Sequence, residues 1–370
     1  MSPLSMAAYT DDPMLQLAAG WNYNRRDVGA PGVPFPSLAE ARREGRLRIG
    51  YLSSDLREHA VGFLMAEVFE LHAREEVETF AYYCGPPATD ALHQRFRDSA
   101  EHFIDLAGMD GATAAARIAA DGIQILVDVN GYTREGRTKL LALRPAPVIV
   151  NWLGYPGSMG SPYHHYIVAD ETIIPPGDEI YYSEKVLRLP CYQPNDRQRA
   201  VAPPRQDRAA AGLPEDATVF CCFNGLHKIT RFTFARWMRI LDGVPGSVLW
   251  LLGSNEVPHQ RLREAAAAQG IAPERLVFAD KLAHPDHLAR YPLADLFLDT
   301  TPYGAHTTAS DALWMGVPVL TFLGRSFPAR VCASLVRAAG MPELVCETAE
   351  DFVATAVRLG CDRERLAALR

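Results

Sequence analysis

The feature that most constrains the fold is a repeated alternation of short β-rich runs with amphipathic stretches. In the first half, helical stretches near 90–100 and 112–120 lie among five such runs: LRIGYLS (47–53), VETFAYYC (77–84), IQILVDV (123–129), PVIVNWL (147–153) and HYIVAD (165–170). Strands that alternate with helices are typical of an open parallel sheet. We therefore expect an α/β protein.

A second alternation follows residues 191–217, which are rich in Pro and charge. Helices are expected near 231–242, 258–269, 284–291 and 307–315, among the strands TVFCCFN (218–224), SVLWLLG (247–253), RLVFAD (275–280), DLFLDT (295–300) and VPVLTF (317–322). This predicts two tandem Rossmann-like domains that face a cleft. We place a lead-in outside the core at 1–46, with a helical stretch SLAEARREGR, and then a first domain at 47–200, a linker at 201–217 and a second domain at 218–370.

Charge and composition exclude several classes of function. Among the 370 residues, 44 acidic residues outnumber 37 basic ones, and the net charge of −7 argues against a nucleic-acid partner. There is no apolar run of roughly 18 residues and no leader pattern, so we expect a cytoplasmic protein without a membrane partner. The seven cysteines include no C-x-x-C pair, which favours buried thiols in a reducing compartment.

Several motifs of common enzyme classes are missing. Neither G-x-G-x-x-G nor a Walker phosphate loop occurs, so dehydrogenases and P-loop NTPases are not indicated. The run PGSMG (156–160) lacks the first Gly of a nucleophile elbow. The pairs His164–His165 and His284–His287 have no third ligand at a suitable spacing, and no D-x-D occurs. We expect no metal site.

The segment after DLFLDT, which reads TPYGAHTTASDALWMGVPV (301–319), predicts a nucleotide diphosphate site. Pro302 and Gly304 indicate a turn, and Thr307 and Thr308 fall where a helix begins. A helix N-terminus attracts phosphate because its N–H groups are free. Asp311 lies a turn further on, where a carboxylate can hold a ribose hydroxyl.

Two further loops follow strands, where ligands bind in doubly wound domains. Lys228 in FNGLHKI (223–229) is placed to neutralise a pyrophosphate. His59 in SSDLREHAVG (53–62) suits an acid–base role. As the group that takes up a proton in catalysis, His59, Asp121 and Asp128 remain alternatives, acting directly or through water.

At these residues the chain resembles the catalytic region of the O-linked N-acetylglucosaminyltransferase family, including bacterial homologues of the Spindly type. The resemblance covers nearly everything from 47 onward. Its most specific stretches are LRIGYLSSD (47–55), DGIQILVDVNGYT (121–133), LRPAPVIVNWLGYPGSMG (143–160) and LADLFLDTTPYGAHTTASDALWMGVPVLT (293–321). Members look like metal-independent, inverting glycosyltransferases of the two-Rossmann (GT-B) type. The resemblance implies transfer of N-acetylglucosamine from UDP-GlcNAc, or another nucleotide sugar, to Ser or Thr of a protein or peptide acceptor, with no separate cofactor.

The resemblance also implies roles for individual residues. The nucleotide lies in the C-terminal domain, and His59 matches the histidine usually assigned as proton acceptor. Two donor-binding positions lie in the loop FNGLHKI (223–229), here called the lysine loop: Gly225, and Lys228 at the leaving UDP. The others are His284, His287 and Arg290 at the uridine, His306, Thr307 and Thr308 at the diphosphate, and Asp311 at the ribose.

The sequence also departs from the family pattern. Animal members have Gln at the position of Gly225 and Lys at that of His284, and His227 replaces the usual Tyr. Family members carry N-terminal tetratricopeptide repeats and a C-terminal helical extension that this chain lacks. Alternatives are fucosyl transfer from GDP-fucose, glucosyl transfer to Asn, a nucleotide-sugar epimerase of the same fold, and an idle nucleotide-sugar-binding module.

Overall fold

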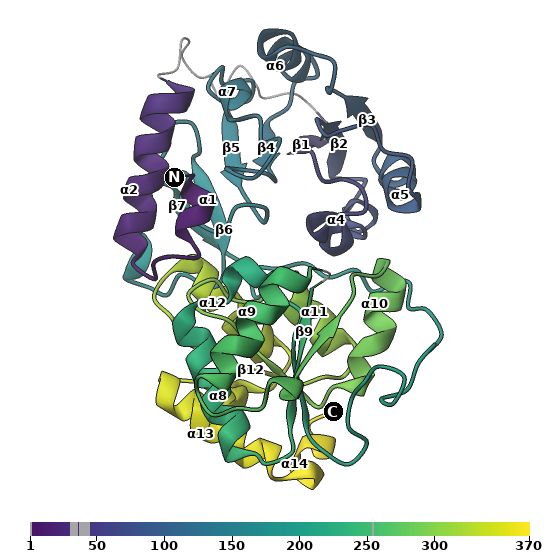
Figure 1. The fold of residues 1–370 in the computed structure, drawn as a ribbon. Coiled ribbons are helices and arrows are strands. Elements are labelled where there is room, and N and C mark those ends of the chain that lie inside the picture. Colours follow the sequence, from purple (N-terminus) through teal and green to yellow (C-terminus); the bar gives the residue numbers. More distant parts are fainter. Residues whose placement is uncertain (1, 30–35, 37–44, 254) are drawn as a thin grey trace. The chain divides into compact units, whose positions relative to one another are not determined.

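The computed structural model describes residues 2–29, 36, 45–253 and 255–370, and the chain divides into two compact units, Met1–Gln198 and Arg199–Arg370 (Figure 1). Each unit is built on one sheet whose paired strands all run parallel. The expected fold class, two Rossmann-like α/β units in tandem, is confirmed.

The sheet of the first unit has seven strands in the order β3-β2-β1-β4-β5-β6-β7. Figure 1 shows β5, β4, β1, β2 and β3 side by side. The chain moves outward from β1 in one direction and then returns to β4 on its other side, so the strand order reverses between β1 and β4. The strands are β1 (Leu47–Ser53), β2 (Val77–Tyr83), β3 (His102–Asp105), β4 (Ile125–Asp128), β5 (Val148–Asn151), β6 (Tyr166–Ala169) and β7 (Lys185–Arg188). The helices of this unit are α1 (Pro3–Met6), α2 (Pro13–Tyr23), α4 (Ala60–Met65), α5 (Ala91–Ser99), α6 (Gly111–Ala120) and α7 (Thr138–Leu141).

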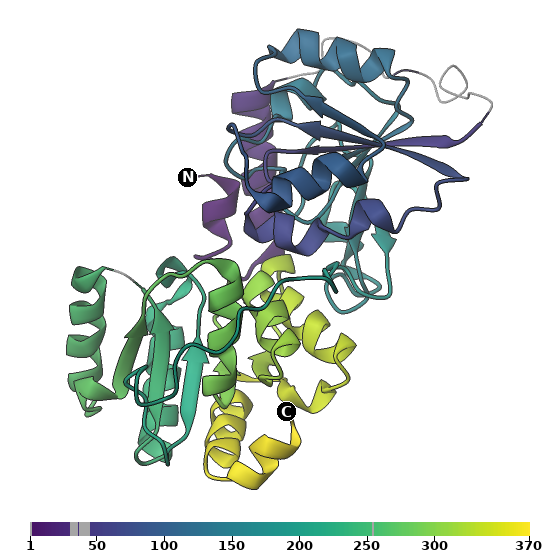
Figure 2. The same cartoon turned by 90° about the vertical axis from the view of Figure 1, so that its right-hand side faces the viewer.

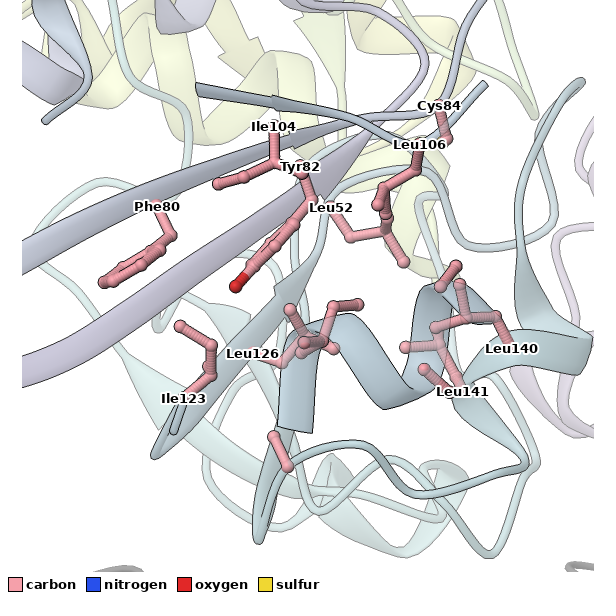
Figure 3. Packing of buried hydrophobic residues seen from close by; sticks show 14 of the residues in the cluster. Leu52, Phe80, Tyr82, Cys84, Ile104, Leu106, Ile123, Leu126, Leu140 and Leu141 are labelled. Atoms are coloured by element: carbon pink, nitrogen blue, oxygen red, sulfur yellow. The ribbon is translucent and has the colours of Figure 1, made fainter. Parts of the chain in front are cut away.

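One face of this sheet packs against α6 and α7. Tyr82 and Leu126 are fully buried there together with Ile118 and Leu141 (Figure 3). Strands that are covered on both faces of a sheet are rich in apolar residues. For this reason β1, β2 and β4 were predictable from the sequence. The shorter edge strands β3 and β7 carry polar residues on their outer faces, and the sequence pattern did not predict them.

The sheet of the second unit has six strands in the order β10-β9-β8-β11-β12-β13, so its order reverses between β8 and β11. Figure 2 shows helices on both sides of these strands. The strands are β8 (Val219–Cys222), β9 (Val248–Leu252), β10 (Leu276–Ala279), β11 (Leu296–Leu298), β12 (Val319–Phe322) and β13 (Val345–Cys346). The helices are α8 (Arg231–Gly243), α9 (Glu256–Ala267), α10 (His284–Arg290), α11 (Thr307–Trp314), α12 (Phe327–Ala338), α13 (Ala349–Gly360) and α14 (Arg363–Ala368).

The N-terminal residues differ from the expected lead-in, because α1 and α2 pack onto the first unit. Gly20 of α2 lies against a backbone: a Cβ there would be 2.9 Å from the carbonyl oxygen of Ser158. Tyr23 contacts the ring of Tyr132 edge-on at 5.0 Å between centroids. The expected helical stretch SLAEARREGR lies outside the described residues, except for its last two.

The segment 191–217, which is rich in Pro and charge and contains the predicted linker at 201–217, makes specific contacts on both sides of the division at 198/199. Asp196 is paired with Arg95 at 2.8 Å, within the first unit. Arg208 is paired with Asp295 at 2.8 Å, within the second. The segment therefore belongs in part to each unit.

All seven cysteines are free thiols. Five are buried, Cys191 is partly exposed and Cys361 is exposed. In the second unit, burial raises the pKa of Cys221, Cys222 and Cys332, so these thiols stay protonated. In the described part of the chain, no helix is both long and apolar enough to span a membrane.

Candidate functional site

Several of the predicted functional residues lie at two topological switch points, one in each unit. In open parallel sheets, ligands bind outside the carboxyl ends of the strands where the strand order reverses. In the first unit, His59 follows β1 and Asp128 ends β4, the two strands on either side of the reversal. In the second unit, Lys228 follows β8 and Thr307 follows β11, which again flank the reversal.

His59 is the N-cap of α4 and is partly exposed, with 40% of its side chain accessible. Its Nδ1 atom lies 3.3 Å from the backbone nitrogen of Val61 and 3.6 Å from Oδ2 of Asp55. Burial lowers the pKa of His59, Asp55 opposes this shift, and Arg57 adds to it. A histidine whose pKa is lowered carries a free nitrogen lone pair at neutral pH and can accept a proton.

The two alternative carboxylates do not share the surroundings of His59. Asp121 precedes β4 at the opposite, amino end of the strand, where it accepts a hydrogen bond from Tyr82 at 2.8 Å and pairs with Arg117. The structure therefore does not bring Asp121 together with His59. Asp128 stands at the correct end of β4, but its side chain is 1% exposed and contacts His164 at 3.1 Å. Neither carboxylate is placed to receive a proton from an acceptor hydroxyl.

In the second unit, α11 begins at the switch point with an open N-terminus. Its N-cap residue, His306, makes no side-chain capping bond. The Thr308 hydroxyl donates to Oδ1 of Asn224, which joins the start of α11 to the loop after β8. Nε2 of His306 lies 3.2 Å from the carbonyl oxygen of Pro328, and burial lowers the pKa of His306 to about 3. The ring is therefore neutral, and its Nε2–H donates a hydrogen bond to that carbonyl oxygen.

Lys228 is partly buried beside the turn that precedes α11. Its ammonium donates to the carbonyl oxygen of Gly304 at 2.8 Å and lies 3.7 Å from the ring centroid of Tyr303. Burial lowers the pKa of Lys228 to about 8, against the opposing charge of Asp299. A desolvated ammonium beside a helix N-terminus is a strong electrostatic partner for a polyanion.

Asp299, which directly follows β11, fixes this turn. Its carboxylate accepts hydrogen bonds from the backbone N–H of Ala305 at 2.7 Å and from the hydroxyl of Thr321 at 2.7 Å. Gly304 fits closely here, because a Cβ at this position would be 3.2 Å from Asp299 and would require a small shift of its neighbours. The carbonyl that Lys228 contacts is therefore held in a fixed place.

Asp311, the expected ribose ligand, is buried and already has two partners. Arg199 donates to its Oδ1 at 2.8 Å, and Nε2 of His284 lies 3.3 Å from its Oδ2. The guanidinium of Arg199 also lies 5.1 Å from the ring centroid of Trp314. A ribose bound at Asp311 must share the carboxylate with these groups or displace one of them.

The residues expected at the uridine lie on α10. His287 packs edge-on against Phe223 and Tyr291, with centroids 5.2 and 5.1 Å away, and burial lowers its pKa to about 4. Arg290 is buried and donates to the carbonyl oxygen of Asp280 at 2.7 Å. A cavity of about 230 Å³ adjoins this helix and is lined by Pro203, Arg205, Gln206, Leu282, Asp286, Ala289 and Arg290.

The lysine loop shows how one departure from the family pattern is accommodated. A Cβ on Gly225 would be 2.7 Å from the imidazole of His227, so a side chain at 225 requires that ring to turn. The glycine and the histidine therefore fit each other.

Comparison with known proteins assigns the family. Residues 31–195 and 198–370 match the family described as glycosyl transferase family 41. The chain belongs to glycosyl transferase family 41.

Relatives in this family carry names that describe one reaction. A probable UDP-N-acetylglucosamine–peptide N-acetylglucosaminyltransferase, SEC, of Arabidopsis thaliana is 38% identical over 100% of this chain and 39% of its own length. A Caenorhabditis elegans UDP-N-acetylglucosamine–peptide N-acetylglucosaminyltransferase is 30% identical over 88% of this chain and 38% of its own length. The chain thus spans well under half of these relatives.

A solved structure of the same kind supports the fold. It is a mutant O-GlcNAc transferase of Thermobaculum terrenum, with 34% identity and a TM-score of 0.85, covering 97% of this chain and 68% of its own. The GT-B arrangement expected for family 41 is thereby confirmed.

Three functional candidates of this family 41 chain were missed by sequence reasoning. Asp55 contacts His59, Asn130 donates to Asp55 at 2.9 Å, and Arg199 pairs with Asp311. Asp55 lies within the strand-end loop SSDLREHAVG, and Asn130 directly follows the strand predicted at 123–129, so the strand-end rule could have found them. Arg199 lies just before the predicted linker at 201–217, and nothing in its sequence neighbourhood indicates a partner 112 residues away.

Proposed function

We propose that this protein is an inverting glycosyltransferase that moves N-acetylglucosamine from UDP-GlcNAc to Ser or Thr hydroxyls of protein acceptors. Membership in family 41 and the names of the relatives support the reaction class. The single observation that carries the proposal is the cationic arrangement at the switch point of the second unit, where the partly buried Lys228 lies beside the turn leading into the open N-terminus of α11.

This arrangement suits a leaving nucleoside diphosphate. As the bond between the sugar and UDP breaks, negative charge grows on the diphosphate, and fixed donors stabilise it most when they need no rearrangement. Lys228 supplies a desolvated positive charge, and Thr307 and Thr308 supply free N–H groups at the helix start. The loss of one such donor typically costs about 3 kcal/mol of transition-state stabilisation. Asp311 is the proposed ribose ligand, with His284, His287 and Arg290 at the base.

We assign the proton of the acceptor hydroxyl to His59. Asp121 and Asp128 are left out because the first lies at the other end of β4 and the second is enclosed. We include no metal ion in the proposal: no D-x-D occurs in the sequence, and in the described residues no group of His, Cys, Asp and Glu side chains is arranged to hold one.

The test is a thermal-shift and transfer panel with UDP, GDP, UDP-GlcNAc, UDP-glucose and GDP-fucose. A nucleotide at 100 times its Kd should add about 2.7 kcal/mol to the stability, and we expect this from UDP and not from GDP. Transfer to a Ser/Thr peptide should occur from UDP-GlcNAc. Stronger stabilisation by GDP, with transfer from GDP-fucose, would replace the proposal by fucosyl transfer. Binding of UDP-GlcNAc without transfer or hydrolysis would identify an idle module.

A further inference from the structure

We propose that Asp55 is a positioning residue for His59, whose carboxylate selects the ring tautomer with a proton on Nδ1 and leaves the Nε2 lone pair for the acceptor hydroxyl. This inference rests on the proposed function, which makes His59 the proton acceptor. It adds the group that prepares the ring for that task.

The geometry places a buried carboxylate beside the ring. Oδ2 of Asp55 lies 3.6 Å from Nδ1 of His59, and the Asp55 side chain is 7% exposed. That distance is an ion-pair distance rather than a hydrogen bond, and catalytic hydrogen bonds are often long before the substrate is bound. Oδ2 receives one hydrogen bond, from Asn130, so it has capacity for a second donor.

The carboxylate of Asp55 is held in place from several directions. The Ser54 hydroxyl donates to Oδ1 at 2.9 Å, the Asn130 amide donates to Oδ2 at 2.9 Å, and the backbone N–H of Asp55 donates to the hydroxyl of Ser53 at 3.0 Å. The same loop packs closely against Gly62, where a Cβ would be 2.8 Å from the carbonyl oxygen of Asp55. Adjustment between the two side chains therefore falls to the more exposed His59 ring.

A second, fully buried set of groups holds Asn130. The Asp128 carboxylate accepts the backbone N–H groups of Asn130 at 3.1 Å and Gly131 at 3.0 Å. Its other oxygen contacts Nε2 of His164, whose Nδ1 lies 2.6 Å from the hydroxyl of Ser161. A continuous polar chain thus runs from the loop before β6 to Asp55, and it gives Asp128 a supporting role in place of the proton transfer considered for it.

Two contacts of Nδ1 compete, one with the backbone N–H of Val61 and one with the carboxylate of Asp55, and we expect the contact with Asp55 to prevail. The Val61 N–H caps α4 on a lone pair of Nδ1 at 3.3 Å, which requires the proton on Nε2. A proton on Nδ1 instead points to the Asp55 carboxylate, and hydrogen bonds to an ionised acceptor are roughly twice as strong as neutral ones. Once Nε2 has taken a proton, only the contact with Asp55 remains favourable.

Two charged side chains, Asp55 and Arg57, act on the ring of His59. Asp55 raises the pKa of His59, and Arg57 lowers it, as does burial. From α5, the cap residue Asp90 bonds the backbone N–H of Glu58 in the same loop at 3.0 Å.

The step balances as a single displacement. The acceptor hydroxyl gives its proton to Nε2 of His59 while an oxygen lone pair forms the bond to the anomeric carbon. The bond from that carbon to the diphosphate oxygen breaks, and its electron pair leaves with UDP. The imidazolium then carries one positive charge, opposite Asp55.

The experiment combines an NMR measurement with rate profiles. In protein labelled with ¹⁵N-histidine, long-range ¹H–¹⁵N spectra distinguish the two ring tautomers, and a His59→Asn variant assigns the signal. We expect the Nδ1–H tautomer in the unmodified protein. In Asp55→Asn the amide can donate to Nδ1, so we expect the Nε2–H tautomer. The matched control is Asp105→Asn, an exposed carboxylate at the end of β3 that accepts a hydrogen bond from the backbone N–H of Ala107.

The pH profile of transfer separates positioning from structural support. Transfer should rise with pH as His59 loses its proton. Asp55→Asn should lower the maximal rate on the order of 10²-fold and move this acidic limb to lower pH, because the carboxylate that raises the pKa of His59 is gone. A structural role alone would lower the rate at every pH without moving the limb.

The outcomes separate this inference from the proposed function. An Nε2–H tautomer in the unmodified protein, or an unmoved acidic limb in Asp55→Asn, overturns the role of Asp55 even if transfer from UDP-GlcNAc is robust. Absence of transfer in the unmodified protein overturns the proposed function, while the NMR result still decides whether Asp55 sets the tautomer. UDP affinity should be unchanged in both Asp variants.

Discussion

Replacing Lys228 by Met should change how stability depends on pH. The Lys228 pKa of about 8 in the folded protein compares with the ordinary value of 10.5. Between these values the unfolded chain binds more protons than the folded one, so the wild-type free energy of unfolding rises with pH relative to the variant. At 1.36 kcal/mol per pKa unit, the difference between the two proteins should change by about 2 kcal/mol from near pH 7 to near pH 9.5.

Urea unfolding followed by tryptophan fluorescence measures this difference, since Trp237 and Trp250 are fully buried in the second unit. Taking the difference between wild type and Lys228→Met removes the titration of all other groups. The exposed Lys139→Met serves as the control and should show no such trend. A wild-type minus variant difference that stays constant over this pH range would refute the argument that Lys228 is a desolvated cation.

Further predictions concern binding and activity. UDP affinity should fall about 30-fold between near pH 7 and near pH 9.5, because the diphosphate binds the protonated lysine; calorimetric titration measures it. His59→Asn keeps a capping side chain for α4, so calorimetry should show unchanged UDP affinity while transfer assays show a loss of about 10²- to 10⁴-fold. Arg199→Met leaves the buried Asp311 carboxylate without its cation and should destabilise the protein by about 3–5 kcal/mol in urea unfolding, whereas adding Asp311→Leu should recover much of that loss. EDTA should change neither UDP affinity nor transfer rate.

The fold was predictable because its central strands are buried on both faces. Runs such as VLWLL (248–252) are apolar throughout, and a strand followed by a helix in each repeat predicts parallel pairing. The edge strands β3 and β7 and the two-residue β13 escaped prediction because a short, half-exposed strand leaves little pattern. The packing of α2 was also missed, since it depends on contacts with distant loops, such as the close approach of Gly20 to Ser158 and the ring contact of Tyr23 with Tyr132.

The candidate site was predictable wherever a strand end and a chemical group coincide in sequence. Lys228, Thr307 and His59 lie in the loops or helix starts that come after strands, and the structure places them at the switch points. What the sequence could not supply is pairing across long separations. Arg199 meets Asp311, and Asn130 meets Asp55, only because the sheets bring distant loops together.

Because the thiols differ in burial, the rates at which they react with a thiol reagent report local opening of the protein. Cys361 is exposed and should react at once with a thiol reagent, whereas Cys221, Cys222 and Cys332 are enclosed in the second unit and Cys84 in the first. The labelling rates of the buried thiols therefore measure how often each unit opens, separately for the two units of one chain. Mass spectrometry of labelled peptides would show whether UDP slows the labelling of the buried thiols in the second unit alone. This result would locate the nucleotide without any assay of catalysis.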